Sequence, residues 1–189
     1  METRESLEDE DGWGPLSGLP GNPMMWILIL SEFAVFGAFF VGFAIAHAVS
    51  PAIFDESQAR LDRLLGGINT LVLVTSGWLA AVALRHKRAE KSPRAPLLGA
   101  MLLGTVFLAV KVTEYGQKFA AGISIETNTF WTLYFLMTGF HALHVVLGIV
   151  ILGVICWHDS LDNVETGTAF WHMVDIIWVI LYPLVYLLR

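Results

Sequence analysis

The segment from Thr127 to Trp157 contains no Asp, Glu, Lys or Arg, and it constrains the fold more than any other feature of the chain. At about 1.5 Å per residue, a helix of this length exceeds the ~30 Å hydrocarbon core of a bilayer. His141 and His144 lie deep inside it at i, i+3 spacing, which places them on nearly one helix face. Because imidazoles facing lipid are costly, we expect this face to look into protein.

The composition extends this conclusion to the whole chain. Its 189 residues are 56% hydrophobic and 15% charged, which is too few charges to cover the surface of a soluble domain. The apolar runs are long and continuous instead of alternating, which argues against a transmembrane β-barrel. We therefore predict an all-α, polytopic membrane helical bundle: a single domain at 24–189 behind a polar, flexible N-terminal tail at 1–23. The five predicted transmembrane helices are at about 24–49, 64–85, 96–119, 127–157 and 167–188.

Charge and cysteine content narrow the class further. The basic loop from Arg85 to Arg94 is the strongest orientation signal and predicts a cytoplasmic N-terminus and a periplasmic C-terminus in a bacterial inner membrane. The acidic first residues argue against a cleaved secretory signal. The single cysteine, Cys156, excludes an intrachain disulfide. With one short basic loop, the chain lacks the charge pattern of a nucleic-acid-binding protein.

Glu32 is the acid inside the first predicted helix, about two turns from its start. An ionised carboxylate in hydrocarbon costs a few kcal/mol, so this group is either protonated or partnered. It is a candidate for a proton-linked, reactive carboxyl or for a hydrogen-bonded packing residue. Counting 1.5 Å per residue from the membrane surface places it within about two turns of His144. We expect a hydrogen bond from Glu32 to His144 or to His141.

The histidines leave several chemical classes open. His144 and His172 could ligate a haem as in a membrane b-type cytochrome, since haem needs axial ligands from facing helices. A zinc site has less support because three or four ligands must converge. His141 and His144 could instead form a proton relay or structural hydrogen bonds. A small proton-coupled transporter centred on Glu32 is a further alternative.

Other polar groups receive structural interpretations. His172 and Asp175 are expected to pair with each other, with capping of a polar seam near the inner surface as the alternative, and Glu165 stands at the start of the last span. Lys111, Glu114 and Lys118 share one helix face that we expect to be solvated or interfacial. The tryptophans are expected mainly at the membrane interface or facing lipid. These are Trp131, Trp157, Trp171 and Trp178.

Four motifs between about Met24 and Leu188 resemble subunit III of the haem–copper oxidases, the cytochrome c oxidase subunit III family. Thr138-Gly139-Phe140-His141-x-Leu143-His144-Val145 with Gly148 is the most specific of them. The others are Ser31-Glu32-Phe33 with Phe39-Phe40 and His47; Asn69-Thr70-Leu71 with Thr75-Ser76-Gly77; and Glu165 with Trp171-His172-x-Val174-Asp175-x-x-Trp178. Glu114-Tyr115 is a weaker fifth match. The common form of the family has seven helices, so this chain resembles a short, five-helix form. In that respect it looks closest to the subunit-III-like protein associated with bacterial nitric oxide reductase.

The resemblance implies an accessory subunit without haem, copper or catalysis of its own, within an oxidoreductase complex of cytochrome c oxidase or nitric oxide reductase type. It implies packing on a catalytic haem–copper subunit and contact with membrane lipids, including bound phospholipid. It also implies support of that subunit's stability, proton uptake and turnover in aerobic or nitrogen-oxide electron transport. Glu32 matches the family's carbodiimide-reactive carboxylate. The buried polar or proton-linked candidates are Glu32, His141, His144, His172, Asp175 and Glu165, and the lipid or packing candidates are His47, Glu114 and Trp171.

Overall fold

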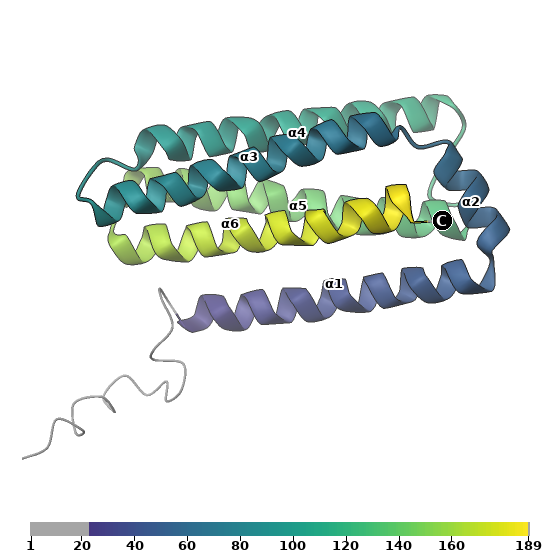
Figure 1. Ribbon diagram of the computed structural model, residues 1–189, viewed down its shortest axis with the longest axis horizontal. Coiled ribbons are helices and arrows are strands. Elements are labelled where there is room, and N and C mark those ends of the chain that lie inside the picture. Colours follow the sequence, from purple (N-terminus) through teal and green to yellow (C-terminus); the bar gives the residue numbers. More distant parts are fainter. Residues whose placement is uncertain (1–22, 189) are drawn as a thin grey trace, which may run out of the picture.

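The computed structural model describes residues 23–188, so the predicted tail lies, apart from Pro23, outside the described residues. The described chain is helical throughout, apart from short connections (Figure 1). The α-helices are α1 (Pro23–Val49), α2 (Pro51–Ala59), α3 (Arg63–Arg88), α4 (Arg94–Ala120), α5 (Thr129–Trp157) and α6 (Leu161–Tyr182), and a π-helical turn, η3 (Pro183–Leu187), follows.

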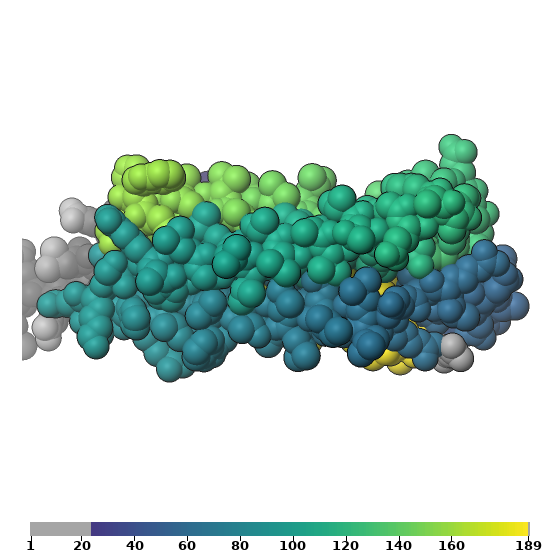
Figure 2. Space-filling model, turned by 90° about the horizontal axis from the view of Figure 1, so that it is seen from above, coloured from purple at the N-terminus to yellow at the C-terminus, as the bar shows by residue number. Residues whose placement is uncertain are grey.

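Five of these helices are long and apolar enough to cross a membrane, which confirms the predicted all-α fold with five spans. Helices α3 and α4 form a hairpin, and α6 packs against both α3 and α5. Helix α1 lies along α5 and α6, on the side of the bundle away from the α3–α4 hairpin (Figure 1). Viewed onto α3 and α4, the molecule is elongated, with α2 at one end (Figure 2).

No helix was predicted between the spans at 24–49 and 64–85, but residues 51–59 form the short helix α2. Pro51 stands at the first helical turn, where its missing N–H costs nothing. Phe54, Ser57 and Gln58 are buried on one face of this short helix. His47 stacks on Phe54 with ring centroids 5.2 Å apart, so this packing candidate fixes the end of α1 against α2.

The last span begins earlier than predicted, because the polar residues after Ser160 are helical. The Ser160 side chain accepts a hydrogen bond from the Asn163 backbone N–H and caps the helix. Asn128 caps α5 in the same way through the N–H of Trp131. Gly122, with φ of +76°, turns the chain after α4, a conformation that favours glycine.

The centre of the bundle is built around Trp171 of α6, which is fully buried. A Cβ at Gly104 of α4 or at Gly148 of α5 would lie within 2.7 Å of its ring, so these glycines make room for it. Its indole N–H donates to Ser76 Oγ of α3, and that hydroxyl donates to the Ala100 carbonyl. Most of the tryptophans expected at the surface are therefore core residues. Trp131, Trp171 and Trp178 are buried, whereas Trp157 is 80% exposed.

Candidate functional site

Glu32 and His144 meet as predicted, but without the hydrogen bond that we expected: Nε2 of His144 lies 3.1 Å from Oε2 of Glu32. The two side chains come from α1 and α5 and are 17% and 10% exposed, respectively. The contact has the length of a hydrogen bond but not its alignment, and Oε2 has no aligned donor within residues 23–188. It is therefore a close acid–base contact whose proton position decides its strength.

The other nitrogen of His144 defines the tautomer of the ring. Nδ1 lies 2.8 Å from the carbonyl oxygen of Phe140, and because a carbonyl only accepts, Nδ1 carries a proton. In a neutral ring, Nε2 then holds a lone pair that faces the carboxyl oxygen of Glu32. Two acceptors at this distance repel each other unless a proton lies between them. A proton on the carboxyl or on Nε2 would remove this repulsion.

His141, one turn away, is even more deeply buried, with 1% of its surface exposed. Its ring lies among those of Phe36, Phe107 and Trp178, with centroid distances of 6.4, 5.7 and 5.1 Å. Neither ring nitrogen has a hydrogen-bond partner among the described residues, so the alternative pairing of His141 with Glu32 does not form. The phenylalanine rings stand nearly perpendicular to the imidazole, an arrangement that suits weak N–H···π contacts.

The prediction that Lys111 and Glu114 lie on a solvated or interfacial face is wrong, because these residues are only 2% and 3% exposed. Lys111 Nζ donates to Glu114 at 2.8 Å and to the hydroxyls of Tyr134 and Tyr186 at 3.1 and 3.0 Å. The Tyr186 hydroxyl donates to the second carboxylate oxygen of Glu114 at 2.8 Å. Four aromatic rings surround the ammonium at 5.0 to 5.6 Å. This network stabilises a buried ion pair and ties η3 to α4 and α5.

The predicted pair of His172 and Asp175 is confirmed, with Nδ1 and Oδ2 3.8 Å apart. The pair lies near the middle of the span Leu161–Leu187, because α6 begins earlier than predicted. Asp175 packs directly on Gly77 of α3, where a Cβ would collide with the carboxylate. Asp175 Oδ1 is buried without a partner among the described residues, whereas the His172 side chain is 41% exposed.

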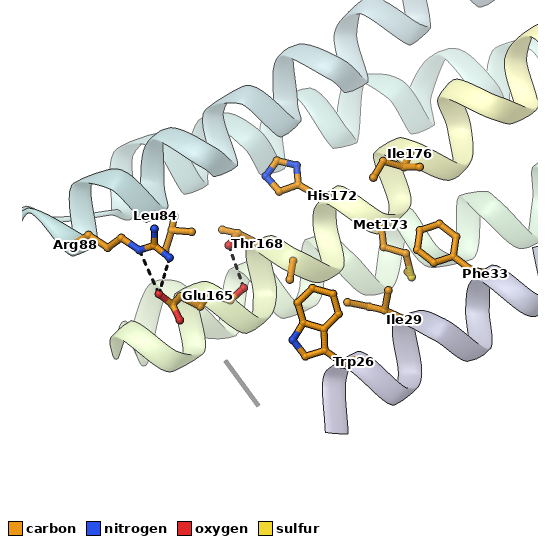
Figure 3. A pocket seen from close by; sticks show the side chains of 11 residues that line it. Trp26, Ile29, Phe33, Leu84, Arg88, Glu165, Thr168, His172, Met173 and Ile176 are labelled. Carbon is orange, nitrogen blue, oxygen red and sulfur yellow. Dashed lines mark hydrogen bonds and ion pairs between the residues drawn. The ribbon is translucent and has the colours of Figure 1, made fainter. Parts of the chain in front are cut away.

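A cavity of about 340 Å³ lies between α1, α3 and α6 (Figure 3). At its end, Arg88 of α3 donates twice to Glu165 Oε1 of α6, at 2.9 and 3.2 Å. Glu165 lies near the start of the last span, as predicted. Its partner Arg88 was not predicted from the sequence. The lining is mostly apolar: Trp26, Ile29, Phe33, Leu84, Arg88, Glu165, Thr168, Ala169, His172, Met173 and Ile176.

The geometry around His144 does not fit the b-type cytochrome alternative. An axial ligand must present a free nitrogen to the iron, but Nδ1 faces the Phe140 carbonyl and Nε2 faces Glu32. A zinc site also lacks ligands, since no three His, Cys, Asp or Glu side chains converge in the part of the chain that the structure describes.

Comparison with known proteins gives a family match over most of the chain. A family model described as cytochrome c oxidase subunit III matches residues 18–189. A protein named cytochrome c oxidase subunit 3 from Synechocystis is 31% identical over 175 residues, covering 86% of this chain and 73% of the relative. A probable quinol oxidase subunit 3 from Staphylococcus aureus is 27% identical over 173 residues, covering 86% of each chain.

One relative is much longer than this chain. A protein from Aeropyrum pernix named heme-copper oxidase subunit I+III is 28% identical over 179 residues. The match covers 86% of this chain and only 22% of that relative.

Proposed function

Because this chain belongs to the cytochrome c oxidase subunit III family, we propose that it is an accessory membrane subunit of a respiratory oxidase, supporting the turnover and proton uptake of a catalytic haem–copper subunit. Beyond the family match, the Glu32–His144 contact carries this proposal. It holds an acid and a base across two helices inside the membrane, where an ionisable group is expected to be functional.

The partner follows from the names of the relatives. The Aeropyrum protein is named for subunits I and III together, and its length leaves ample chain for the first of them. We propose that the present chain contacts a separate catalytic subunit I. The chemistry of oxygen reduction belongs to the haem and copper of that partner, and the present chain supplies packing surface and polar groups.

The relatives support an oxidase more than a nitric oxide reductase. Their names are cytochrome c oxidase subunit 3 and probable quinol oxidase subunit 3. We therefore propose an aerobic oxidase whose electron donor is cytochrome c or a quinol. The likeness to the nitric-oxide-reductase-associated protein, drawn from the five-helix length, receives no support from these names.

The Glu32–His144 pair gives the proposed role a physical basis. A shared proton would keep the pair neutral overall, and an imidazole 3.1 Å away would take up a proton that the carboxyl releases, so a proton could move between them without a net charge arising at this depth. Phe36 and Phe140 pack on the imidazole with centroid distances of 5.5 and 4.7 Å, which shields one side of the pair. We propose that this pair buffers protons beside the partner and thereby supports its uptake of protons.

The cavity between α1, α3 and α6 supports a second element of the proposal, a bound phospholipid. Its apolar walls suit acyl chains, and Arg88 at its end suits an anionic headgroup. Arg88 is 57% exposed although it is paired with Glu165, so its guanidinium keeps surface for a further contact. A phospholipid here would fill the space that separates α1 from α3 along this face.

Copurification in mild detergent tests the proposed function. A tagged chain should bring down a larger subunit that carries haem and copper, and the complex should consume oxygen. A chain that purifies alone with a stoichiometric haem absorption band of its own would favour the b-type cytochrome instead. Proton flux in vesicles that contain only this chain, abolished by Glu32→Gln, would favour the transporter alternative.

A further inference from the structure

A groove of about 480 Å³ runs between α3 and α6, separate from the Glu32–His144 contact. The two helices lie side by side on the near side of the bundle (Figure 1). Its rim is apolar and exposed: Val74, Trp78, Ile176, Val179 and Ile180 are between 44% and 58% exposed. The absence of a side chain at Gly77 makes room for the Asp175 carboxylate, and the His172–Asp175 pair lines the groove.

The polar pair makes this groove unusual for a surface that faces lipid. The His172 side chain is 41% exposed, at a depth near the middle of a span of 27 residues. Asp175 has one buried oxygen without a partner among the described residues, and its other oxygen is 3.8 Å from the imidazole, too far for a good hydrogen bond. Ionisable side chains at this depth normally face protein or water, because lipid offers them no hydrogen bonds.

We propose that the groove between α3 and α6 is the docking site for a transmembrane helix of the catalytic subunit, which places a hydrogen-bond donor against the His172–Asp175 pair. This inference rests on the proposed function, which supplies the partner. The groove is lined by residues of two spans, α3 and α6, so a helix that crosses the membrane beside them could enter it. The rim residues provide apolar packing, and the polar pair provides the specific contact that lipid chains cannot make.

Contacts in the groove are tested by photo-crosslinking from single positions of the full-length chain in the purified complex. A photoreactive amino acid replaces Val74 or Val179 in the groove, both 46% exposed. Matched controls carry it at Leu102 of α4 and Val150 of α5, which are 65% and 56% exposed on other faces. The groove positions should crosslink to the haem-bearing subunit at least several-fold more than the controls.

Two results overturn the inference: crosslinks from the groove to a second copy of this chain or to lipid, and equal or stronger crosslinking to the haem-bearing subunit from the controls. A failure of the proposed function looks different. In that case no haem-bearing subunit copurifies with the unmodified chain, whichever position carries the probe. When the haem-bearing subunit copurifies but the groove positions form no crosslink to it, the proposed docking site is wrong and the proposed function still stands.

Substitutions separate the polar contact from folding. Val179→Trp fills the groove while keeping both members of the polar pair and should reduce copurified haem per chain several-fold, whereas Val150→Trp should leave it unchanged. Asp175→Leu should reduce it similarly, and Asp175→Asn, which keeps an acceptor oxygen, should retain most of it. Melting temperatures of the isolated chains identify variants that merely unfold. Unchanged haem per chain in both Val179→Trp and Asp175→Leu would overturn the docking site.

Discussion

Glu32 of α1 and His144 of α5 meet at 3.1 Å beside a cluster of phenylalanines that joins the same two helices. Phe36 and Phe39 of α1 both pack on Phe140 of α5, with ring centroids 5.3 and 5.9 Å apart. Aromatic packing tolerates small rotations and shifts of a helix, whereas an acid–base contact does not. The pair therefore defines the register of α1 on α5.

Glu32→Gln removes a carboxyl group that can gain and lose a proton, while it keeps the size of the side chain and offers an amide N–H to the lone pair of Nε2. The complex should assemble with unchanged haem per chain, because the amide can still contact His144. Proton uptake or the number of turnovers before inactivation should change, as measured by oxygen consumption of the reconstituted complex. Ser31→Ala on the neighbouring position is the control. Loss of membrane insertion by Glu32→Gln would show that the role is structural.

Lys111→Met leaves the Glu114 carboxylate buried without its cation. Breaking a buried pair by removing one partner costs about 3–5 kcal/mol, whereas replacing both partners by apolar groups costs far less. Lys111→Met should therefore unfold in detergent more readily than the double variant Lys111→Met/Glu114→Leu. Lys118→Met, which loses an exposed contact to the Arg60 carbonyl, should change stability by no more than about 1 kcal/mol. Equal losses in the single and double variants would contradict this interpretation of the network.

Gly148→Ala forces a Cβ to within 2.6 Å of the Trp171 ring, which is held on all sides by the bundle. Overpacking of this kind costs about 1–3 kcal/mol, so the melting temperature in detergent should fall. Gly37→Ala is the matched control, because a Cβ there meets nothing within 4 Å. It should be neutral or slightly stabilising, since alanine favours helix. A similar fall in both variants would show that Trp171 is not tightly confined.

The spans and the Glu32–His144 contact could be predicted from sequence because both depend on position along the membrane normal. Apolar length defines each span, and 1.5 Å per residue gives the depth of each polar group. Two polar side chains at the same depth, on helices of one bundle, are expected to contact each other because lipid offers them no hydrogen bonds. The same counting could not separate His144 from His141, because one helical turn is within its error.

The burial of Lys111 could not be predicted from its neighbours in sequence. The spacing to Glu114 indicated a pair, but the hydroxyls of Tyr134 and Tyr186 come from residues 23 and 75 positions away. Without them, two charges near a helix end suggest solvent. The buried tryptophans were misjudged for a related reason, since the room for Trp171 is made by Gly104 and Gly148 on two other helices. Helix α2 was not predicted because its sequence is short and partly charged. Its buried face contains only Phe54, Ser57 and Gln58.

Arg88→Gln tests whether the cavity between α1, α3 and α6 holds a phospholipid. The substitution removes the cation at the end of the cavity but leaves its apolar walls, so a lipid with an anionic headgroup should lose its anchor. Native mass spectrometry of the purified complex should show at least one phospholipid fewer per chain. Arg85→Gln, in the same basic segment but outside the lining, is the control and should retain the lipid. Met173→Trp, which fills the cavity from α6, should displace the lipid even with Arg88 present. Retention of the full lipid complement in both Arg88→Gln and Met173→Trp would locate the bound lipid elsewhere on the complex.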